Sequence, residues 1–337
     1  MEIDANERLM VKIPTIEERS KREKELRKTR AENLLDFGVK FLNCALEGIA
    51  RNDLIILGAP TGTGKTELVT HIGAFNAWKG KRILFFPLEA EECEIESRIK
   101  FKLAAQAYFH DQRPDKVIIR AVNYRNWYHN KLGEAFAPYE AQADERFQKS
   151  FKTFRTIYRK TEFKIEDLQR HLMLFKDETD LVIVDHLNYF DTDEPNENKA
   201  VTDIVKRIRD LALLSNLPII LVAHIKKADK KFRTVAPEID DFHGTSNITK
   251  IATKAILLSP DRDAPVDPKK FSTFIRVAKF RVDGSVSRYI AKCAFNIETN
   301  RYEDDFILGT TSDDGRGFAP IEGRHLYPAW ALSGGST

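Results

Sequence analysis

The sequence predicts an α/β fold in which a mostly parallel, twisted sheet is flanked by helices. Short apolar runs rich in β-branched residues recur after residue 52, and stretches with helical character separate most of them. Runs that are apolar throughout are typical of strands buried on both faces of a parallel sheet, because crossover helices cover such a sheet. The runs that predict strands are 53–58, 82–88, 116–122, 181–187, 218–224 and 254–259.

A different pattern follows these runs toward the C-terminal end. The apolar stretches 271–280 and 286–298 are joined by residues 282–285, whose sequence is Val-Asp-Gly-Ser. Two strand-like runs around a short turn of this composition predict an antiparallel hairpin. We therefore expect a C-terminal antiparallel hairpin to complete the sheet.

The composition is that of a globular chain with a substantial core. Of the 337 residues, 42% are apolar and 31% are charged, which excludes a disordered or fibrous chain. The net charge of +3 leaves any nucleic-acid surface to local clustering of basic residues. Cys44, Cys93 and Cys293 lie far apart, which favours a reducing, cytoplasmic location over a disulfide framework or a zinc site. The sequence predicts neither a signal peptide nor a membrane span.

Composition also divides the chain into three parts. Residues 1–40 carry charges of both signs at helical spacing, which predicts a charged helical arm or linker, either solvated or packed on a neighbouring subunit. Residues 41–305 hold the strands and form the predicted core, with a helical insertion at about 123–160, and residues 306–337 predict a loosely ordered tail. Four aromatic residues of the insertion fall four, three and four positions apart, which predicts a stripe on one helix, and we interpret this stripe as core in preference to a face for a partner or DNA. It comprises Phe147, Phe151, Phe154 and Tyr158.

The strongest chemical signal is the segment 54–69, LIILGAPTGTGKTELV. A buried strand runs into a Gly- and Thr-rich turn and then into a helix, an arrangement whose backbone N–H groups surround a β-phosphate. Lys65 would reach the β- and γ-phosphates of a nucleotide, and the Thr66 hydroxyl would ligate Mg²⁺. Ala59 stands where glycine is usual, but the cradle consists of backbone amides. The loop predicted to bind ATP comprises Ala59, Pro60, Thr61, Gly62, Thr63, Gly64, Lys65 and Thr66.

Two acidic residues follow other predicted strands. Asp185 ends the apolar part of 181–187, and a carboxylate in such a strand is costly to bury unless it has a partner. We therefore expect Asp185 to hold Mg²⁺ together with Thr66. Glu89 follows the run 82–88 at the edge where a parallel sheet presents residues to a ligand, and it is the predicted base that polarises the attacking water.

His224 ends the run 218–224 and is followed at once by a basic segment. It is either a structural histidine or a sensor that hydrogen-bonds the γ-phosphate and reports its loss. The basic segment is either a solvated face or a loop that binds the phosphate backbone of a nucleic acid. Its basic residues are Lys226, Lys227, Lys230, Lys231 and Arg233.

Taken together, these residues resemble the DnaB-like hexameric helicases of the RecA-like superfamily, which include phage primase–helicases and the mitochondrial Twinkle helicase. The similarity runs over about 41–305. FFPLEAEECEIESRI resembles the family's strand with its catalytic glutamate, LVIVDHLNYF its metal-aspartate strand, and LVAHIKK its sensor motif. The resemblance implies a RecA-like P-loop ATPase core and supports Glu89, Asp185 and His224 in the roles given above.

Two further motifs receive a role only from the resemblance. IDDFHGTSNITKIATKAILLS is similar to the stretch that lines the family's central DNA channel, which implies nucleic-acid contacts by His243 and Gly244, although His243 replaces an arginine. VAKFRVDG looks like the family's Lys-x-Arg motif, which implies that Lys279 and Arg281 reach the γ-phosphate of the neighbouring subunit. The alternative is that these two residues only alternate along an exposed strand.

The resemblance implies an Mg²⁺- and ATP-dependent DNA helicase that forms a ring, with six subunits expected, around single-stranded DNA. The segment before residue 50 is too short for a helical N-terminal domain or a primase domain, so a primase or a loader would be separately encoded partners. Two alternatives stay open. One is a RecA- or RadA-like recombination or remodelling ATPase, and the other is a KaiC-like regulatory ATPase that does not bind DNA.

Overall fold

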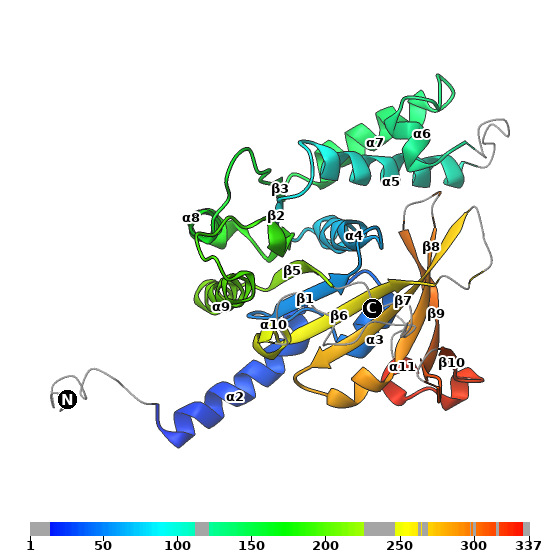
Figure 1. Ribbon diagram of the computed structural model, residues 1–337. Helices are drawn as coiled ribbons and strands as arrows, with labels where there is room; N and C mark the ends of the chain where they lie inside the picture. The colour runs from blue at the N-terminus through cyan, green and yellow to red at the C-terminus, as the bar shows by residue number, and fades with distance from the viewer. Residues whose placement is uncertain are drawn as a thin grey trace.

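A ten-stranded sheet runs through the computed structural model, with the strand order β10-β9-β8-β7-β6-β1-β5-β4-β2-β3 (Figure 1). Strands β1 to β6 pair in parallel, and β7 to β10 extend the sheet from β6 in antiparallel order. The predicted α/β fold with its C-terminal hairpin, β7–β8, is thereby confirmed. The structure describes residues 14–111, 121–225, 247–261, 264, 269–296, 298, 301–314 and 317–332. The strands are β1 (Leu54–Ala59), β2 (Ile83–Pro87), β3 (Phe154–Thr156), β4 (Leu181–Asp185), β5 (Ile219–His224), β6 (Lys254–Pro260), β7 (Lys270–Phe280), β8 (Ile290–Asn296), β9 (Arg301–Thr311) and β10 (Phe318–Pro320).

Helices cover both faces of the parallel part of the sheet. The α-helices are α2 (Ile16–Arg30), α3 (Lys40–Leu46), α4 (Lys65–Trp78), α5 (Glu94–His110), α6 (Tyr124–Tyr128), α7 (Ala137–Ser150), α8 (Ile165–Phe175), α9 (Glu197–Ser215), α10 (Asn247–Ile251) and α11 (Ala329–Leu332). Short 3₁₀ helices are η1 (Ala31–Asn33), η2 (Lys176–Glu178), η3 (Leu187–Tyr189), η5 (Gly284–Arg288) and η6 (Arg324–Leu326). In the described part of the chain, none of these helices combines the length and the apolar character needed to cross a bilayer.

The central strands are fully buried because their side chains alternate between two cores. In β1, Ile55 and Leu57 belong to a core that also receives Ile72 of α4. Ile56 belongs to the core on the opposite face, with Ile208 of α9. Helices α3, α4 and α5 contribute to the first core, and α8, α9 and α10 contribute to the second. Apolar residues at every position of β1 are therefore required by packing on both sides.

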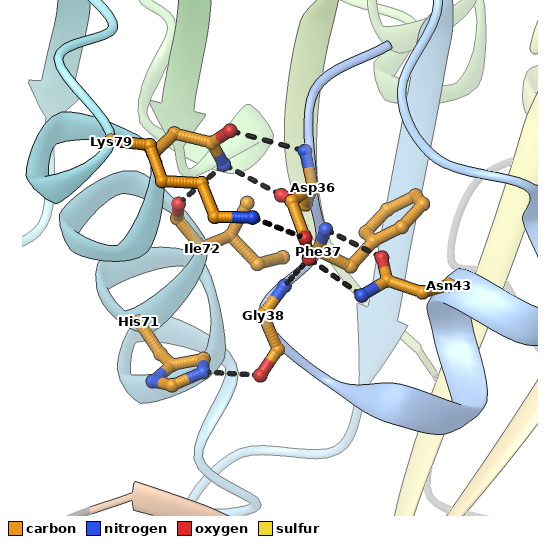
Figure 2. Close-up of polar contacts among 8 residues, drawn as sticks. Asp36, Phe37, Gly38, Asn43, His71, Ile72 and Lys79 are labelled. Atoms are coloured by element: carbon orange, nitrogen blue, oxygen red, sulfur yellow. Dashed lines mark hydrogen bonds and ion pairs between the residues drawn. The ribbon is translucent and has the colours of Figure 1, made fainter. Parts of the chain in front are cut away.

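A polar network fastens the segment before α3 to helix α4 (Figure 2). The Asn76 side chain accepts a hydrogen bond from the backbone N–H of Asp36 at 3.1 Å and donates one to the Asp36 carbonyl at 2.6 Å. The His71 Nε2 donates to the Gly38 carbonyl at 2.7 Å, and the Lys79 ammonium lies 3.0 Å from the Asp36 carboxylate. These contacts fix the N-terminal segment against the helix that begins at the predicted nucleotide loop.

The charged N-terminal region contains α2, which projects from the rest of the structure (Figure 1). Residues 14–29 are all exposed. The (i, i+4) ion pair of Arg27 with Glu23, at 2.6 Å, is of the kind that supports a solvated helix.

The insertion differs from the expected uninterrupted helical stripe. Helix α7 ends at Ser150, and Phe154 lies in strand β3, which pairs in parallel with β2 at the sheet edge. Phe151 is nevertheless buried, and Phe147 and Phe154 pack against the same core. The core interpretation of these aromatic residues is right, while their placement on a single helix is wrong, because edge pairing with β2 draws Phe154 into a strand.

The expectation of a loosely ordered tail over 306–337 is wrong for most of that range. Strand β9 continues to Thr311 and pairs with β8 and β10. Leu308 is fully buried, and its backbone N–H donates to the Tyr327 hydroxyl at 2.9 Å. The Trp330 ring packs on Phe41 of α3, with ring centroids 6.2 Å apart. Aromatic packing therefore holds this Gly- and Ser-rich region on the core.

One predicted strand has no counterpart in the described residues. Of the run 116–122, residues 116–120 lie outside them, and Ala121 and Val122 belong to a turn and an irregular segment.

Candidate active site

The loop between β1 and α4 has the backbone conformation that its sequence predicts. Gly62 and Gly64 have φ angles of 77° and 87°, in the left-handed region that favours glycine. The Thr63 hydroxyl closes the turn by donating to the Pro60 carbonyl at 2.7 Å. Because α4 starts directly after Gly64, its free N–H groups and positive dipole end face the loop. The loop can therefore bind an anionic phosphate.

Lys65 lies inside this loop and is only 6% exposed. Its ammonium donates to the carbonyls of Ala59 and Pro60, at 3.1 and 3.2 Å, and lies 2.9 Å from Nδ1 of His224. Burial lowers the pKa of Lys65, and the carboxylates of Asp185 and Glu89 oppose that shift. The parallel register pairs Ala59 with His224, so neighbouring strands bring the lysine and the histidine together.

Asp185 ends β4 and is buried beside Thr66. Its Oδ2 accepts a hydrogen bond from the Thr66 hydroxyl at 2.6 Å, whereas its Oδ1 has no hydrogen-bond partner among the described residues. Burial raises the pKa of Asp185 to about 6, and the hydrogen bond from Thr66 and the charge of Lys65 lower it. A carboxylate and a hydroxyl oxygen are the ligands that Mg²⁺ prefers. The unpartnered Oδ1 shows that these residues fit such an ion.

Glu89 lies at the same edge of the sheet. Strand β2 pairs Pro87 with Asp185, and the backbone N–H groups of Leu88 and Glu89 both donate to the Asp185 carbonyl, at 2.5 and 3.3 Å. Burial, followed by the nearby Glu89 carboxylate, raises the pKa of Tyr189. The Glu89 side chain is 43% exposed. It can therefore change its orientation while its backbone stays fixed.

His186 is a site residue that the sequence analysis missed. It is fully buried, and its ring lies against that of His224 with the centroids 3.8 Å apart. Its Nε2 lies 3.9 Å from Oε2 of Glu89. Burial, together with the proximity of His224 and Lys65, lowers the pKa of His186 to about 3. The available sequence signal is its position directly after Asp185, the predicted metal ligand.

Lys279 and Arg281 do not lie at this site. The Lys279 ammonium donates to the carbonyls of Thr249 and Lys250, at 2.5 and 3.0 Å. The backbone N–H of Arg281 donates to the Thr253 carbonyl, and the Thr253 N–H donates to the carbonyl of Leu54, the first residue of β1. The nucleotide loop begins at the other end of β1. At ~3.3 Å a residue, a six-residue strand separates the two edges by ~20 Å.

The residues predicted to contact nucleic acid lie outside the described residues. They are Lys226, Lys227, Lys230, Lys231, Arg233, His243 and Gly244.

Comparison with known proteins agrees with this architecture. A model of the DnaB-like helicase C terminal domain matches residues 35–304. A solved ATPase domain superimposes with a TM-score of 0.70 at 14% identity, over 87% of this chain and 99% of that one. A DnaB-like replicative helicase, solved in a study of its interactions with primase, superimposes with a TM-score of 0.66 at 14% identity, over 86% and 67% of the two chains.

At such identity the two solved structures show the fold alone, and a comparison with curated protein sequences finds no match. The family model, however, spans the glycine-rich loop, Asp185 and the Lys-x-Arg segment. The chain therefore belongs to the DnaB-like helicase C-terminal domain family and is an ATP-hydrolysing enzyme of the helicase class.

Proposed function

We propose that this chain is an Mg²⁺- and ATP-dependent motor that forms a ring, expected to be hexameric, around single-stranded DNA. In this proposal ATP binds between subunits and is hydrolysed with the help of basic residues from the neighbour. The observation that carries the proposal is that Lys65 and Arg281 lie near opposite ends of strand β1. Lys65 follows the carboxyl end of this strand, and Arg281 lies near its amino end.

Each residue around the loop has a separate proposed role at the nucleotide. Lys65 would offset the charge of the β- and γ-phosphates, and the γ-phosphate would take the place of the loop carbonyls as its partner. Thr66 and Asp185 would hold Mg²⁺, which supplies positive charge to the phosphates when bound. Glu89 would orient the attacking water and accept its proton. His224, already in contact with Lys65, would detect the loss of the γ-phosphate.

Separation across the sheet leaves Lys279 and Arg281 without access to the ATP of their own subunit. An extended arginine side chain spans only a fraction of the ~20 Å between the two strand ends. Arg281 is exposed, so a neighbouring subunit can approach it. In head-to-tail assembly, the surface of one subunit that carries Arg281 meets the nucleotide loop of the next. Repeated contacts of this kind form a ring when the rotation between subunits closes. An arginine supplied in this way typically contributes ~10³–10⁵ in rate.

The sequence also places a basic segment where a phosphate sensor could act on it. Five Lys and Arg residues fall within positions 226–233, directly after His224 and Ile225. Such a segment suits the phosphates of a single strand, and each contact would contribute ~0.7 to the salt dependence of log affinity. Movement of His224 on phosphate release would then shift the contacts along the strand.

A separately encoded primase or loader is the proposed protein partner. The similar structure solved in a study of primase interactions supports this part of the proposal.

Electron microscopy of the chain with a slowly hydrolysed ATP analogue and a single strand tests the assembly. We expect a closed ring with Arg281 of one subunit beside the nucleotide of the next, together with ATP-dependent separation of forked duplexes. A filament would favour a RecA-like recombination ATPase. Absence of strand binding at low salt would favour a regulatory ATPase.

A further inference from the structure

The histidine that follows Asp185 has contacts that the proposed roles do not use. His186 is fully buried where β4 passes into η3. Its ring packs edge-on against His224 and against Tyr189, with ring centroids 3.8 and 5.4 Å away. It therefore lies between the proposed γ-phosphate sensor and the surroundings of Glu89.

The hydrogen bond at one ring nitrogen fixes the proton on the other. The backbone N–H of Asn188 donates to Nδ1 of His186 at 3.2 Å. In a neutral ring whose Nδ1 accepts, the hydrogen is on Nε2. That Nε2 is buried and has no hydrogen-bond partner among the described residues. A buried donor of this kind favours any conformation that offers it an acceptor.

The acceptor within reach is the carboxylate of Glu89. Oε2 of Glu89 lies 3.9 Å from Nε2 of His186, just beyond hydrogen-bond distance. In the present conformation Glu89 also lies near Tyr189, whose pKa is raised by burial and by the Glu89 charge. The Glu89 backbone N–H is held by the Asp185 carbonyl at 3.3 Å. A rotation of the Glu89 side chain alone can therefore bring its carboxylate within hydrogen-bond distance of Nε2 of His186.

A transition-metal site is the competing interpretation, because ligand atoms of Glu89, His186 and His224 all lie within 4.8 Å of one another. A histidine ligand needs a lone pair toward the metal and usually donates its other N–H outward. Here Nδ1 of His186 accepts from Asn188, and Nδ1 of His224 accepts from the Lys65 ammonium. Both rings therefore present Nε2–H donors, beside a lysine cation. The cluster suits a carboxylate or a phosphate better than a metal ion.

We propose that His186 is a positioning residue for Glu89: when nucleotide is bound, its Nε2–H donates to the carboxylate and fixes the orientation in which Glu89 accepts a proton from the attacking water. This inference rests on the proposed role of Glu89 as the base. It assigns His186 as the hydrogen-bond partner of Glu89 during hydrolysis.

A matched pair of variants isolates the donor. His186→Gln keeps an amide N–H near the position of Nε2, and His186→Met has a similar length without a donor. We expect the kcat for ATP to fall ~10–100-fold in His186→Met with KM within about twofold of the parent, since the loss concerns orientation and not binding. His186→Gln should retain most of the kcat. Both variants should bind a slowly hydrolysed ATP analogue like the parent.

Two results would overturn the proposal. One is parental kcat in folded His186→Met, and the other is an equal loss of kcat in the Gln and Met variants with normal analogue binding. If His186→Met fails to fold, His186→Phe replaces it, because its ring preserves packing on His224 and Tyr189 without offering a donor. Glu89→Gln distinguishes failure of the proposed base from failure of the role of His186. Parental ATPase activity in Glu89→Gln would contradict the assignment of Glu89 as the base. An inactive Glu89→Gln beside a fully active His186→Met would contradict only the role of His186.

Discussion

The ammonium nitrogen of Lys65 lies 2.9 Å from Nδ1 of His224, although the two residues are 159 positions apart in the chain. The contact exists because β1 and β5 are adjacent and in register, with Ala59 beside His224. It joins the residue that would bind the terminal phosphates to the strand that leads into the basic segment. Binding or release of a phosphate at Lys65 would therefore change the surroundings of His224 directly.

Replacement of this lysine is the first prediction. Lys65→Ala should lower ATPase activity by ~10²-fold or more, because the cation inside the loop is lost where transition-state charge develops. Lys81→Ala, at an exposed position after α4, serves as the matched control and should keep parental activity. Steady-state ATPase assays test this prediction, and parental rates in Lys65→Ala would show that the loop is not the nucleotide site.

Replacement of the buried Asp185 carboxylate is predicted to lower the activity and to raise the stability of the fold. Asp185→Asn should abolish Mg²⁺-dependent ATPase activity while keeping a carbonyl oxygen that accepts from Thr66. Burial raises the pKa of Asp185 to about 6, so the ionised form destabilises the fold at neutral pH. We expect the free energy of unfolding, measured in chelator, to rise by at most about 3 kcal/mol, the value to which a shift of this size corresponds. A clear decrease would show that the ionised carboxylate supports the fold.

His71 predicts how stability depends on pH. Burial lowers its pKa in the folded chain from 6.5 to about 4, with the charges of Lys102 and Arg301 adding to the shift. Between these values the unfolded chain binds a proton that the folded chain does not, so acidification destabilises the fold, by about 3 kcal/mol at the acid end.

The variant His71→Gln, which can still donate to the Gly38 carbonyl, isolates this contribution. The variant should not lose the stability that protonation of His71 costs the parent. The free energy of unfolding in urea of the parent should therefore fall relative to that of the variant as the pH is lowered from 6.5 to about 4. A constant difference over that range would contradict the assignment to His71.

Gly38 is predicted to tolerate no side chain. It has a φ of +64°, and an added Cβ would lie 2.8 Å from Nε2 of His71 and 2.9 Å from the Phe75 ring. Gly80 is the matched control, because its φ is +78° and nothing lies within 4 Å of its Cβ position. Gly80→Ala should cost ~1 kcal/mol from backbone strain alone, and Gly38→Ala should cost ~3 kcal/mol or more from strain and overpacking. Thermal unfolding of the two variants measures the difference, and equal losses would show that α4 yields to the added methyl group.

The parts that the sequence predicted correctly depend on local pattern. Continuous apolar runs mark β1, β4 and β5 because both faces of these strands are buried, and the glycine spacing marks the loop because Gly62 and Gly64 need positive φ. The proximity of Asp185 and Glu89 also followed from the rule that parallel strands end at one edge.

The parts that it missed depend on pairing between distant segments. The part of strand β9 after position 305 looks like a tail because Gly, Ser and Asp residues are frequent there and beyond, and only the buried Tyr302, Phe306 and Leu308 reveal the period of two. The role of His186 requires β4 and β5 to be neighbours, and the position of Arg281 across the sheet from Lys65 requires the strand order, neither of which composition encodes.

Mixing two inactive proteins tests most directly whether the ATP site is shared between subunits. Glu89→Gln and Arg281→Ala should each have little ATPase activity alone. If Arg281 acts on its neighbour, about a quarter of the interfaces in a random equal mixture regain both groups, and activity should peak near that ratio. Activity that stays at the level of the separate variants at every ratio, in assemblies shown to exchange subunits, would contradict the shared site.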